Sequence, residues 1–277
     1  MDWWGLLLWT VRKSGRQKNL GQTIKEIREK LHQSVVTEQE LKELAADERK
    51  GVQHLLQQYY RRQEKLAAEK ARYQRMWHYE NELREKGYKL IAGIDEVGRG
   101  PLAGPVVAAA VILPENVALD GLNDSKQLSL AKRESLFLEI QETALAIGIG
   151  VVSPETIDRL NIYQATLLAM EQALQKLTPQ PDFVLIDAMT VKNSSLPQKS
   201  LIKGDAKSVS IAAASVMAKV TRDRMMADYD QTFPGYGFAK NAGYGTAEHL
   251  AGLADNGVTA IHRKSFSPVK EMLQQSQ

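Results

Sequence analysis

Cysteine is absent from all 277 residues of the sequence. Its absence excludes a scaffold held by disulfides, a zinc site built on thiolates and a cysteine nucleophile. A sequence without cysteine also suits a reducing compartment, so we expect a cytoplasmic protein. Long apolar runs are missing too: the apolar stretch within residues 1–9 is far shorter than the roughly 20 residues that cross a bilayer. We therefore expect no membrane association.

Residues 1–22 show no pattern that predicts regular structure. The apolar stretch in residues 1–9 has no basic segment before it and no small-residue cleavage site after it, unlike a secretion signal. We expect a flexible tail over residues 1–22. A start placed too early and a weak surface anchor are the alternatives.

The excess of positive over negative charge is also small, since the net charge is only +3 at pH 7. Its distribution is uneven: residues 1–88 hold 18 Lys and Arg against 13 Asp and Glu, and the rest holds 18 against 20. The basic excess therefore lies in the N-terminal third.

Residues 23–87 are predicted to be a helical extension. Apolar residues recur at helical spacing in Ile24, Ile27 and Leu31. Thr37 and Glu40 have the spacing of a capping box at the start of a helix. Basic side chains are interspersed through the later part, at Arg61, Arg62, Lys65, Lys70, Arg72 and Arg75. Three interpretations stay open: a solvated helical hairpin, a basic arm that holds nucleic-acid phosphates, or a protein-docking module.

Residues 88–277 are predicted to be one α/β domain. Short apolar runs bounded by Gly and Pro predict buried strands at 90–94, 106–112, 146–152, 183–186 and 200–202. Helices are predicted at 129–143, 153–177 and 208–229. Strands that alternate with helices indicate an α/β fold, and the first strands are close enough in sequence to pair antiparallel.

Four carboxylates follow three of the predicted strands. Asp95 and Glu96 come directly after residues 90–94, Asp187 ends the run 183–186, and Asp205 follows the run 200–202. If those strands are neighbours, the four acids converge and repel one another, which favours a bound divalent cation. Oxygen ligands alone favour Mg²⁺ or Mn²⁺, and two ions about 4 Å apart would suit phosphodiester hydrolysis. The alternative is that each acid merely caps a turn or a helix, and the pattern alone does not decide.

A set of ordered motifs resembles bacterial ribonuclease HII. The most specific is Gly93-Ile-Asp-Glu-Val-Gly-Arg-Gly-Pro-Leu-Ala-Gly-Pro-Val106. The supporting segments are Asn123–Lys126, Ile186–Ala188, Lys203–Lys207, Gly243–Thr246 with His249, and Ile261–Phe266. Together they span about residues 89–266.

This resemblance implies a ribonuclease H-like fold, with a mixed five-stranded sheet flanked by helices. It implies an endonuclease that cuts the RNA strand of RNA–DNA hybrids and nicks 5′ of single ribonucleotides in duplex DNA, leaving 5′-phosphate and 3′-hydroxyl ends. Asp95, Glu96, Asp187 and Asp205 would be the catalytic and metal-binding set, holding two Mg²⁺ or Mn²⁺ ions. The segment 98–100 and an aspartate at 205 favour ribonuclease HII over the related ribonuclease HIII.

The resemblance also implies which residues bind the substrate. Gly98 and Gly100 would let the backbone approach a ribose, since neither has a side chain, and Arg99 would hold the adjacent phosphate. Tyr244 would pack against the nucleotide on the DNA side of the RNA–DNA junction and hydrogen-bond the 2′-hydroxyl. A plain tight turn is the alternative for residues 98–100. Phosphate contacts are expected from three lysines, for which solvated surface is the alternative: Lys126, Lys203 and Lys207.

Three weaker signals remain. His249 is predicted on a helix, with a structural or a catalytic role. Residues 127–130 (Gln-Leu-Ser-Leu) are similar to segments that dock replication proteins on the sliding clamp, although they overlap a predicted helix start. The family's N-terminal extension opens like Thr23–Ile27 and is implied to help substrate binding. We expect a monomer. The competing functions are a DNA-specific nuclease on the same fold and a non-catalytic hybrid-binding protein.

Overall fold

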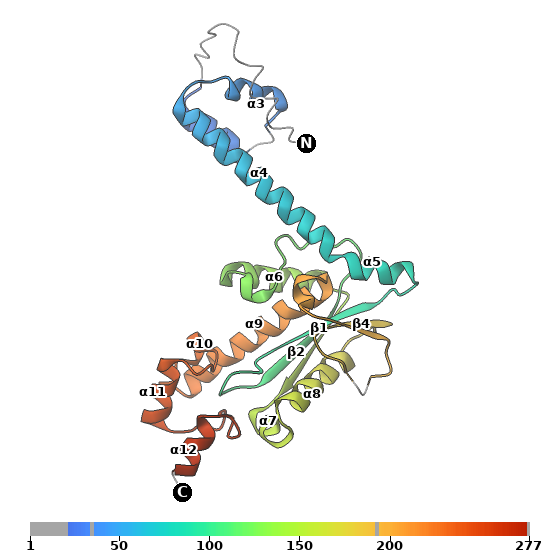
Figure 1. Ribbon diagram of the computed structural model, residues 1–277, viewed down its shortest axis with the longest axis vertical. Helices are drawn as coiled ribbons and strands as arrows, with labels where there is room; N and C mark the ends of the chain where they lie inside the picture. The colour runs from blue at the N-terminus through green and yellow to red at the C-terminus, as the bar shows by residue number, and fades with distance from the viewer. Residues whose placement is uncertain (1–21, 34–35, 192–193, 276–277) are drawn as a thin grey trace. The chain divides into compact units, whose positions relative to one another are not determined.

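The computed structural model describes residues 22–33, 36–191 and 194–275, and it divides into two compact units with the boundary between Ala71 and Arg72 (Figure 1). Each unit is described by itself. The tail expected over residues 1–22 lies outside the described residues, apart from Gln22. No helix within the described ranges is long and apolar enough to cross a membrane.

The first unit is helical, as predicted. It contains α2 (Ile24–Gln33), α3 (Glu38–Ala45) and most of α4 (Lys50–Met76). The apolar residues at helical spacing meet in a small core made of Ile27, Leu31, Val36, Leu44, Val52, Leu55 and Leu56. The predicted capping box is confirmed: the Glu40 amide donates to Thr37 Oγ1 at 3.3 Å, and the Thr37 amide donates to Glu40 Oε2 at 2.8 Å.

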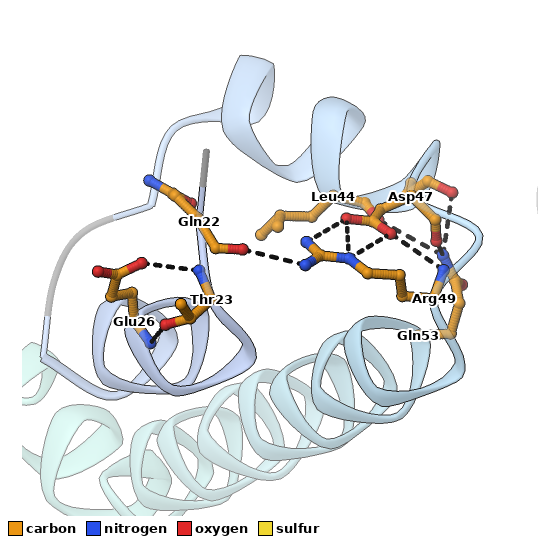
Figure 2. A network of polar contacts seen from close by, with 8 residues as sticks. Gln22, Thr23, Glu26, Leu44, Asp47, Arg49 and Gln53 are labelled. Atoms are coloured by element: carbon orange, nitrogen blue, oxygen red, sulfur yellow. Dashed lines mark hydrogen bonds and ion pairs between the residues drawn. The ribbon is translucent and has the colours of Figure 1, made fainter. Parts of the chain in front are cut away.

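A polar network ties the turn between α3 and α4 to the start of the unit (Figure 2). Arg49 Nη2 lies 2.6 Å from Asp47 Oδ2, and Arg49 Nη1 donates to the Gln22 carbonyl at 3.0 Å. Gln53 Nε2 donates to the Asp47 carbonyl at 2.6 Å and to the Leu44 carbonyl at 3.4 Å. The Gln53 side chain thus adds donors to carbonyls at and just after the end of α3, and Arg49 links the same turn to Gln22.

The second unit is built on the mixed five-stranded sheet that the sequence predicts. Its strands are β1 (Ile91–Val97), β2 (Val106–Ile112), β3 (Ala146–Val152), β4 (Phe183–Asp187) and β5 (Gln198–Leu201). They lie in the order β3-β2-β1-β4-β5. The first three pair antiparallel, as expected, and β4 and β5 continue the sheet parallel to β1.

Helices cover both faces of this sheet (Figure 1). On one face lie α7 (Pro154–Leu160) and α8 (Ile162–Gln175), and on the other lie α6 (Leu130–Thr143) and α9 (Val209–Thr232). The alternation of β2 explains the two layers: Val106, Ala108, Ala110 and Ile112 pack toward α8, and Val107, Ala109 and Val111 pack toward α9. Because both faces are covered, β2 is apolar throughout.

One helix prediction is wrong in its length. Residues 153–177 were expected to form a single helix, but the chain breaks at Asn161 between α7 and α8. Asn161 has φ 70°, and its side chain accepts a hydrogen bond from the Gln164 amide at 3.1 Å, so it caps α8. The predicted start is confirmed, since Ser153 is the N-cap and Pro154 is the first residue of α7.

Short helices complete the second unit. A helix α5 (His78–Glu85) precedes β1, and 3₁₀ turns occur at η1 (Ser125–Gln127) and η2 (Gly204–Ala206). The C-terminal part contains α10 (Phe238–Asn241), α11 (Ala247–Asn256) and α12 (Val269–Gln275). These helices pack around their own apolar cluster, which includes Leu102, Ala103, Tyr236, Phe238, Leu253 and Ile261.

Candidate active site

Asp95 and Glu96 lie within β1, which continues to Val97 and is therefore longer than the predicted run 90–94. The helix α9 passes directly over this strand at Gly93. A Cβ placed on Gly93 would lie 2.1 Å from the carbonyl carbon of Ser210, so any larger residue would push the helix away. By the strand's alternation Asp95 shares the face of Gly93, and this puts its carboxylate beneath α9, where Ser215 hydrogen-bonds it.

Asp187 lies on the strand next to that of Asp95, so these two strands meet the condition under which the acids converge. The strands β1 and β4 run parallel with Ile94 opposite Ile186, so Asp95 and Asp187 follow at the same level of the sheet. Gly204 donates its amide to Asp187 Oδ1 at 2.7 Å and so ties the η2 turn, which carries Asp205, to the end of β4. The structure thus brings all four predicted carboxylates to one end of the sheet.

The carboxylates repel one another in this position. Burial, followed by the nearby charges of Glu96 and Asp187, raises the pKa of Asp95 well above its ordinary value, although hydrogen bonds from Ser215 and the Glu96 amide oppose the rise. Burial also raises the pKa of Glu96, against the influence of Arg99. Burial together with Asp124 and Asp187 raises the pKa of Asp205. A cation bound among them would relieve this repulsion.

The chemistry of the four acidic side chains suits a divalent cation. All four donors are carboxylates, which suit Mg²⁺ and Mn²⁺. Glu96 Oε2 is buried and has no hydrogen-bond partner in the structure, so it is an acceptor that an ion could occupy. Over the described ranges, however, no three His, Asp or Glu side chains are grouped closely enough to hold an ion as they stand. Their oxygens are partly engaged elsewhere, Asp187 Oδ1 by Gly204 and Glu96 Oε1 by Arg99 at 3.1 Å.

The loop 98–100 follows β1 directly, and its two glycines are needed for different reasons. Gly98 has φ +90°, and a Cβ there would lie 2.2 Å from Arg222 Nε and 2.7 Å from the Pro105 carbonyl oxygen. At Gly100 a Cβ would meet only Tyr244 Cε1, at 3.6 Å. Gly98 is therefore required by the protein interior, and Gly100 leaves open space on the exposed side of the loop.

Tyr244 lies next to this loop and is 47% exposed. Its loop is joined to the 98–104 loop, because the Leu102 amide donates to the Gly243 carbonyl at 2.8 Å. The Tyr244 amide donates to the Asn241 carbonyl at 3.0 Å, and its own carbonyl accepts from His249. The backbone of Tyr244 is therefore held next to the 98–104 loop, and its half-exposed ring lies beside Gly100.

The three predicted phosphate-binding lysines are all exposed. Lys126 lies within the influence of the acids: burial opposes its charge, but Asp124, Asp95 and Asp205 more than offset this and raise the pKa of Lys126. Lys203 and Lys207 flank the η2 turn that carries Asp205, and Lys203 has φ 57°. The turn thus presents a lysine on each side of a carboxylate.

The structure shows the surroundings of two weaker sequence signals, His249 and residues 127–130. His249 is fully buried on α11, whose N-cap is Thr246, so it has no access to a substrate at the surface. Within residues 127–130, Leu128 packs against the core beneath α9 and Leu130 is 66% exposed. Ser129 caps α6, which confirms the overlap of this segment with a helix start.

Three buried charged residues escaped prediction from the sequence. Glu80 on α5 is 2% exposed, and its Oε1 accepts from the Ser210 amide at 3.0 Å and from the hydroxyls of Ser208 and Ser210, which secures the start of α9. Arg222 and Arg263 have no exposed surface, and among the residues that the structure describes their hydrogen bonds go to backbone carbonyls. No sequence signal singles out Arg222, because the stretch 208–229 also holds charged residues that are not buried, Lys219, Asp223, Arg224 and Asp228.

Comparisons with known proteins cover both units. Residues 92–269 match the family described as Ribonuclease HII, and residues 23–84 match the Ribonuclease HII N-terminal domain. A ribonuclease HII from Listeria monocytogenes serotype 4b (strain F2365) is 56% identical over 254 residues, which are 91% of this chain and 97% of the relative.

Solved structures agree with this similarity. The ribonuclease H2 of Pyrococcus horikoshii OT3 matches with a TM-score of 0.58 and 26% identity, over 67% of this chain and 97% of that one. A ribonuclease HII of Archaeoglobus fulgidus, solved in a complex with PCNA, matches with a TM-score of 0.56 and 27% identity, over 64% of this chain and 95% of that one.

Proposed function

Because the chain belongs to the ribonuclease HII family, a family of metal-dependent hydrolases, we propose that it cuts the RNA strand of RNA–DNA hybrids and nicks 5′ of single ribonucleotides in duplex DNA. The products would carry 5′-phosphate and 3′-hydroxyl ends. One observation supports this most: the carboxylates Asp95 and Asp187 lie at one level of adjacent strands, and the loop 98–100 leaves β1 beside them. The acids proposed for metal-assisted hydrolysis therefore lie next to the loop proposed to recognise a ribose.

Asp95, Glu96, Asp187 and Asp205 would hold two Mg²⁺ or Mn²⁺ ions. When bound, such ions supply an activated water and stabilise the departing 3′ oxygen. The chain's own contribution is the burial of Asp95 and the fixed position of Asp187, whose Oδ1 is hydrogen-bonded by Gly204. Both features limit the number of conformations that the acids can adopt, and the burial that disfavours the charge of Asp95 is what a bound cation would offset.

The residues around the acids would choose the cleavage position. Arg99 pairs with Glu96 in the structure and is 44% exposed at its side chain, so it can turn to a phosphate of the substrate. Gly98 and Gly100 keep the loop backbone free of side chains, and Tyr244 presents its ring beside Gly100. Contact with a 2′-hydroxyl at this position would distinguish RNA from DNA.

Lysines would add phosphate contacts at the edge of the site. Lys126 faces the acids, and Lys203 and Lys207 flank Asp205 on an exposed turn. A substrate strand that reaches the carboxylates would pass these three positive charges.

Residues 23–87 would act as a basic arm that strengthens substrate binding without choosing the cleavage site, and residues 88–277 would carry the chemistry. Support comes from exposed basic residues of α4 for which the described part of the chain shows no ion pair, such as Arg61, Lys65 and Lys70. Long-range attraction from such charges increases affinity for any duplex.

Three further expectations stay predictions: a monomeric state, a cytoplasmic location and docking on a sliding clamp through residues 127–130. The complex of the Archaeoglobus fulgidus protein with PCNA concerns that protein. In this chain the apolar side chain of Leu130 is available to a partner and that of Leu128 is partly used by the core.

The decisive experiment uses an end-labelled DNA duplex with one ribonucleotide, incubated with the protein and Mg²⁺ or Mn²⁺. We expect a single nick 5′ of the ribonucleotide, abolished by EDTA and by Asp95→Asn. Cleavage of a matched all-DNA duplex would instead favour a DNA-specific nuclease. Tight binding without a nick would favour a non-catalytic hybrid-binding protein.

A further inference from the structure

Two buried arginines hold the loop that runs from Gly98 to Pro105. Arg263 donates through Nε to the Gly104 carbonyl at 3.0 Å, through Nη1 to the Arg99 carbonyl at 2.9 Å, and through Nη2 to the carbonyls of Gly98 and Gly104. Arg222 donates to the carbonyls of Pro105 at 2.9 Å, Ala103 at 3.1 Å and Ala242 at 2.8 Å. Both arginine side chains are fully buried.

Neither arginine has a carboxylate partner within ion-pair distance in the part of the chain that the structure describes. Burial lowers the pKa of Arg222 to about 10, and burial together with repulsion from Arg222 lowers the pKa of Arg263 to about 9. Both therefore stay charged at neutral pH, and two like charges lie close together inside the protein. Such an arrangement is unfavourable unless the hydrogen bonds to the loop offset it.

The bonds from Arg263 determine which way the loop amides point. In a planar trans peptide the N–H lies opposite the C=O. The carbonyls of Gly98 and Arg99 point inward to Arg263, so the amide N–H groups of Arg99 and Gly100, which belong to the same two peptide planes, point outward. Both residues are exposed, and no hydrogen bond within the described residues uses either N–H.

Two successive outward N–H groups form a small concave donor site for an anionic or hydroxyl oxygen. Gly98 has a positive φ, and Arg222 lies so close beneath it that no side chain fits there. The guanidinium groups thus fill the inner side of the loop and leave its donors on the outer side. A Cβ built on Gly100 would meet Tyr244, at 3.6 Å.

We propose that Arg263 and Arg222 are positioning residues, which hold the amide N–H groups of Arg99 and Gly100 outward to donate to oxygens of the ribonucleotide. The inference rests on the proposed function, because it assumes that the loop 98–100 reads a ribonucleotide. A lysine at either position keeps the positive charge but lacks the planar guanidinium group. Its single nitrogen cannot donate to the same set of carbonyls.

The test compares Arg263→Lys and Arg222→Lys with the unaltered protein. The matched control is Arg224→Lys, the same change two residues along α9, where Arg224 is 52% exposed and pairs with Glu134 at 2.6 Å. Fluorescence anisotropy measures affinity for a DNA duplex with one ribonucleotide and for the same duplex without it. Ca²⁺ replaces the catalytic ion in these measurements, as a cation that accepts oxygen ligands with looser geometry.

We expect the unaltered protein and Arg224→Lys to prefer the ribonucleotide duplex. In Arg263→Lys and Arg222→Lys the ratio of the two affinities should fall about tenfold, while affinity for the all-DNA duplex is unchanged. A fall of both affinities by the same factor, together with a lower melting temperature, would show a purely structural role and overturn the inference. So would an unchanged ratio in folded variants.

The two possible failures are distinguishable. If the unaltered protein binds both duplexes equally, the proposed function fails and the inference fails with it. If the lysine variants do not fold, hydrogen exchange on the unaltered protein decides: the amides of Arg99 and Gly100 should be protected by the ribonucleotide duplex and not by the all-DNA duplex. Exchange that neither duplex slows would contradict the inference.

Discussion

His249 and His262 are hydrogen-bonded to each other through their Nε2 atoms at 3.0 Å, inside the apolar cluster of the C-terminal helices. Their outer partners determine the proton positions. His249 Nδ1 must donate to the Tyr244 carbonyl at 2.9 Å, and His262 Nδ1 must accept from the Thr259 amide at 2.9 Å. It follows that His262 Nε2 donates to His249 Nε2 and that both rings are neutral. The pair therefore has a structural role, to hold the backbone of Tyr244.

This pair predicts a loss of stability in weak acid. Burial, followed by the nearby His249, lowers the pKa of His262 to about 4, and burial also lowers the pKa of His249. Unfolded histidines bind protons near pH 6.5. Between pH 6.5 and 4 the unfolded state thus binds more protons than the folded state. The free energy of unfolding should therefore fall by up to about 3 kcal/mol as the pH is lowered through that window.

Urea denaturation at successive pH values measures this loss. Replacement of His262 with Gln should make the free energy of unfolding change less with pH between pH 6.5 and 5. Replacement of the exposed His78 with Gln is the control and should leave it unchanged. An unchanged slope in the His262 variant would show that other groups cause the acid sensitivity.

Asp95→Asn is predicted to remove activity and to increase stability in EDTA. The raised pKa of Asp95 means that the folded state disfavours its charge, so stability falls as pH rises above the unfolded value near 4. Asparagine avoids that penalty at neutral pH. We expect a higher melting temperature, by roughly 2–4 °C per kcal/mol gained, and a loss of activity of at least about a hundredfold.

The control for Asp95→Asn is Asp255→Asn on the exposed side of α11. Addition of Mg²⁺ should raise the melting temperature of the unaltered protein and of Asp255→Asn, and should have little effect on Asp95→Asn. If Asp95→Asn melts below the unaltered protein in EDTA, the repulsion described for the carboxylates does not limit stability.

Tyr244→Ala should reduce cleavage at a single embedded ribonucleotide more than cleavage of a long RNA–DNA hybrid. The exposed ring beside Gly100 offers a stacking surface, and such a contact contributes about 1–3 kcal/mol. We therefore expect kcat/KM on the single-ribonucleotide duplex to fall about tenfold further than on the hybrid. Tyr163→Ala changes another exposed tyrosine, on α8, and should affect neither substrate. Equal losses on both substrates would remove the junction-reading role.

Charge on α4 is predicted to control the salt dependence of binding. The variant Arg61→Gln/Lys65→Gln removes two exposed positive charges and keeps residues that favour a helix. The slope of log affinity against log salt should become less steep by roughly 1–2, with the same cleavage position. The variant Glu64→Gln/Glu69→Gln on the same helix should not reduce the slope. Identical slopes for all three proteins would leave the extension without a role in binding nucleic acid.

Local features of this protein follow from its sequence. The apolar runs predicted β1 to β4 because buried strands need continuous apolar residues. The fifth strand was predicted at 200–202 but lies at Gln198–Leu201, where the middle residues are exposed, so an apolar run did not mark it. The Thr37–Glu40 box and the Ser153–Pro154 start were confirmed because capping depends on residues three positions apart. The position of Asp95, Asp187 and Asp205 after apolar runs predicted that they would converge if their strands were neighbours. The structure shows that β1 and β4 are neighbours, with Asp95 and Asp187 at one level of the sheet.

Tertiary structure alone decided the rest. The positive φ at Asn161 divides a helix that its periodicity predicted to be continuous. The reason for Gly98 is a guanidinium from Arg222, more than a hundred positions away in the chain, and the proton positions on His249 depend on a partner in another segment. Sequence spacing carries information about neighbours within a helix or strand. Sequence spacing carries no information about which buried polar groups become hydrogen-bond partners, because that depends on how the elements pack.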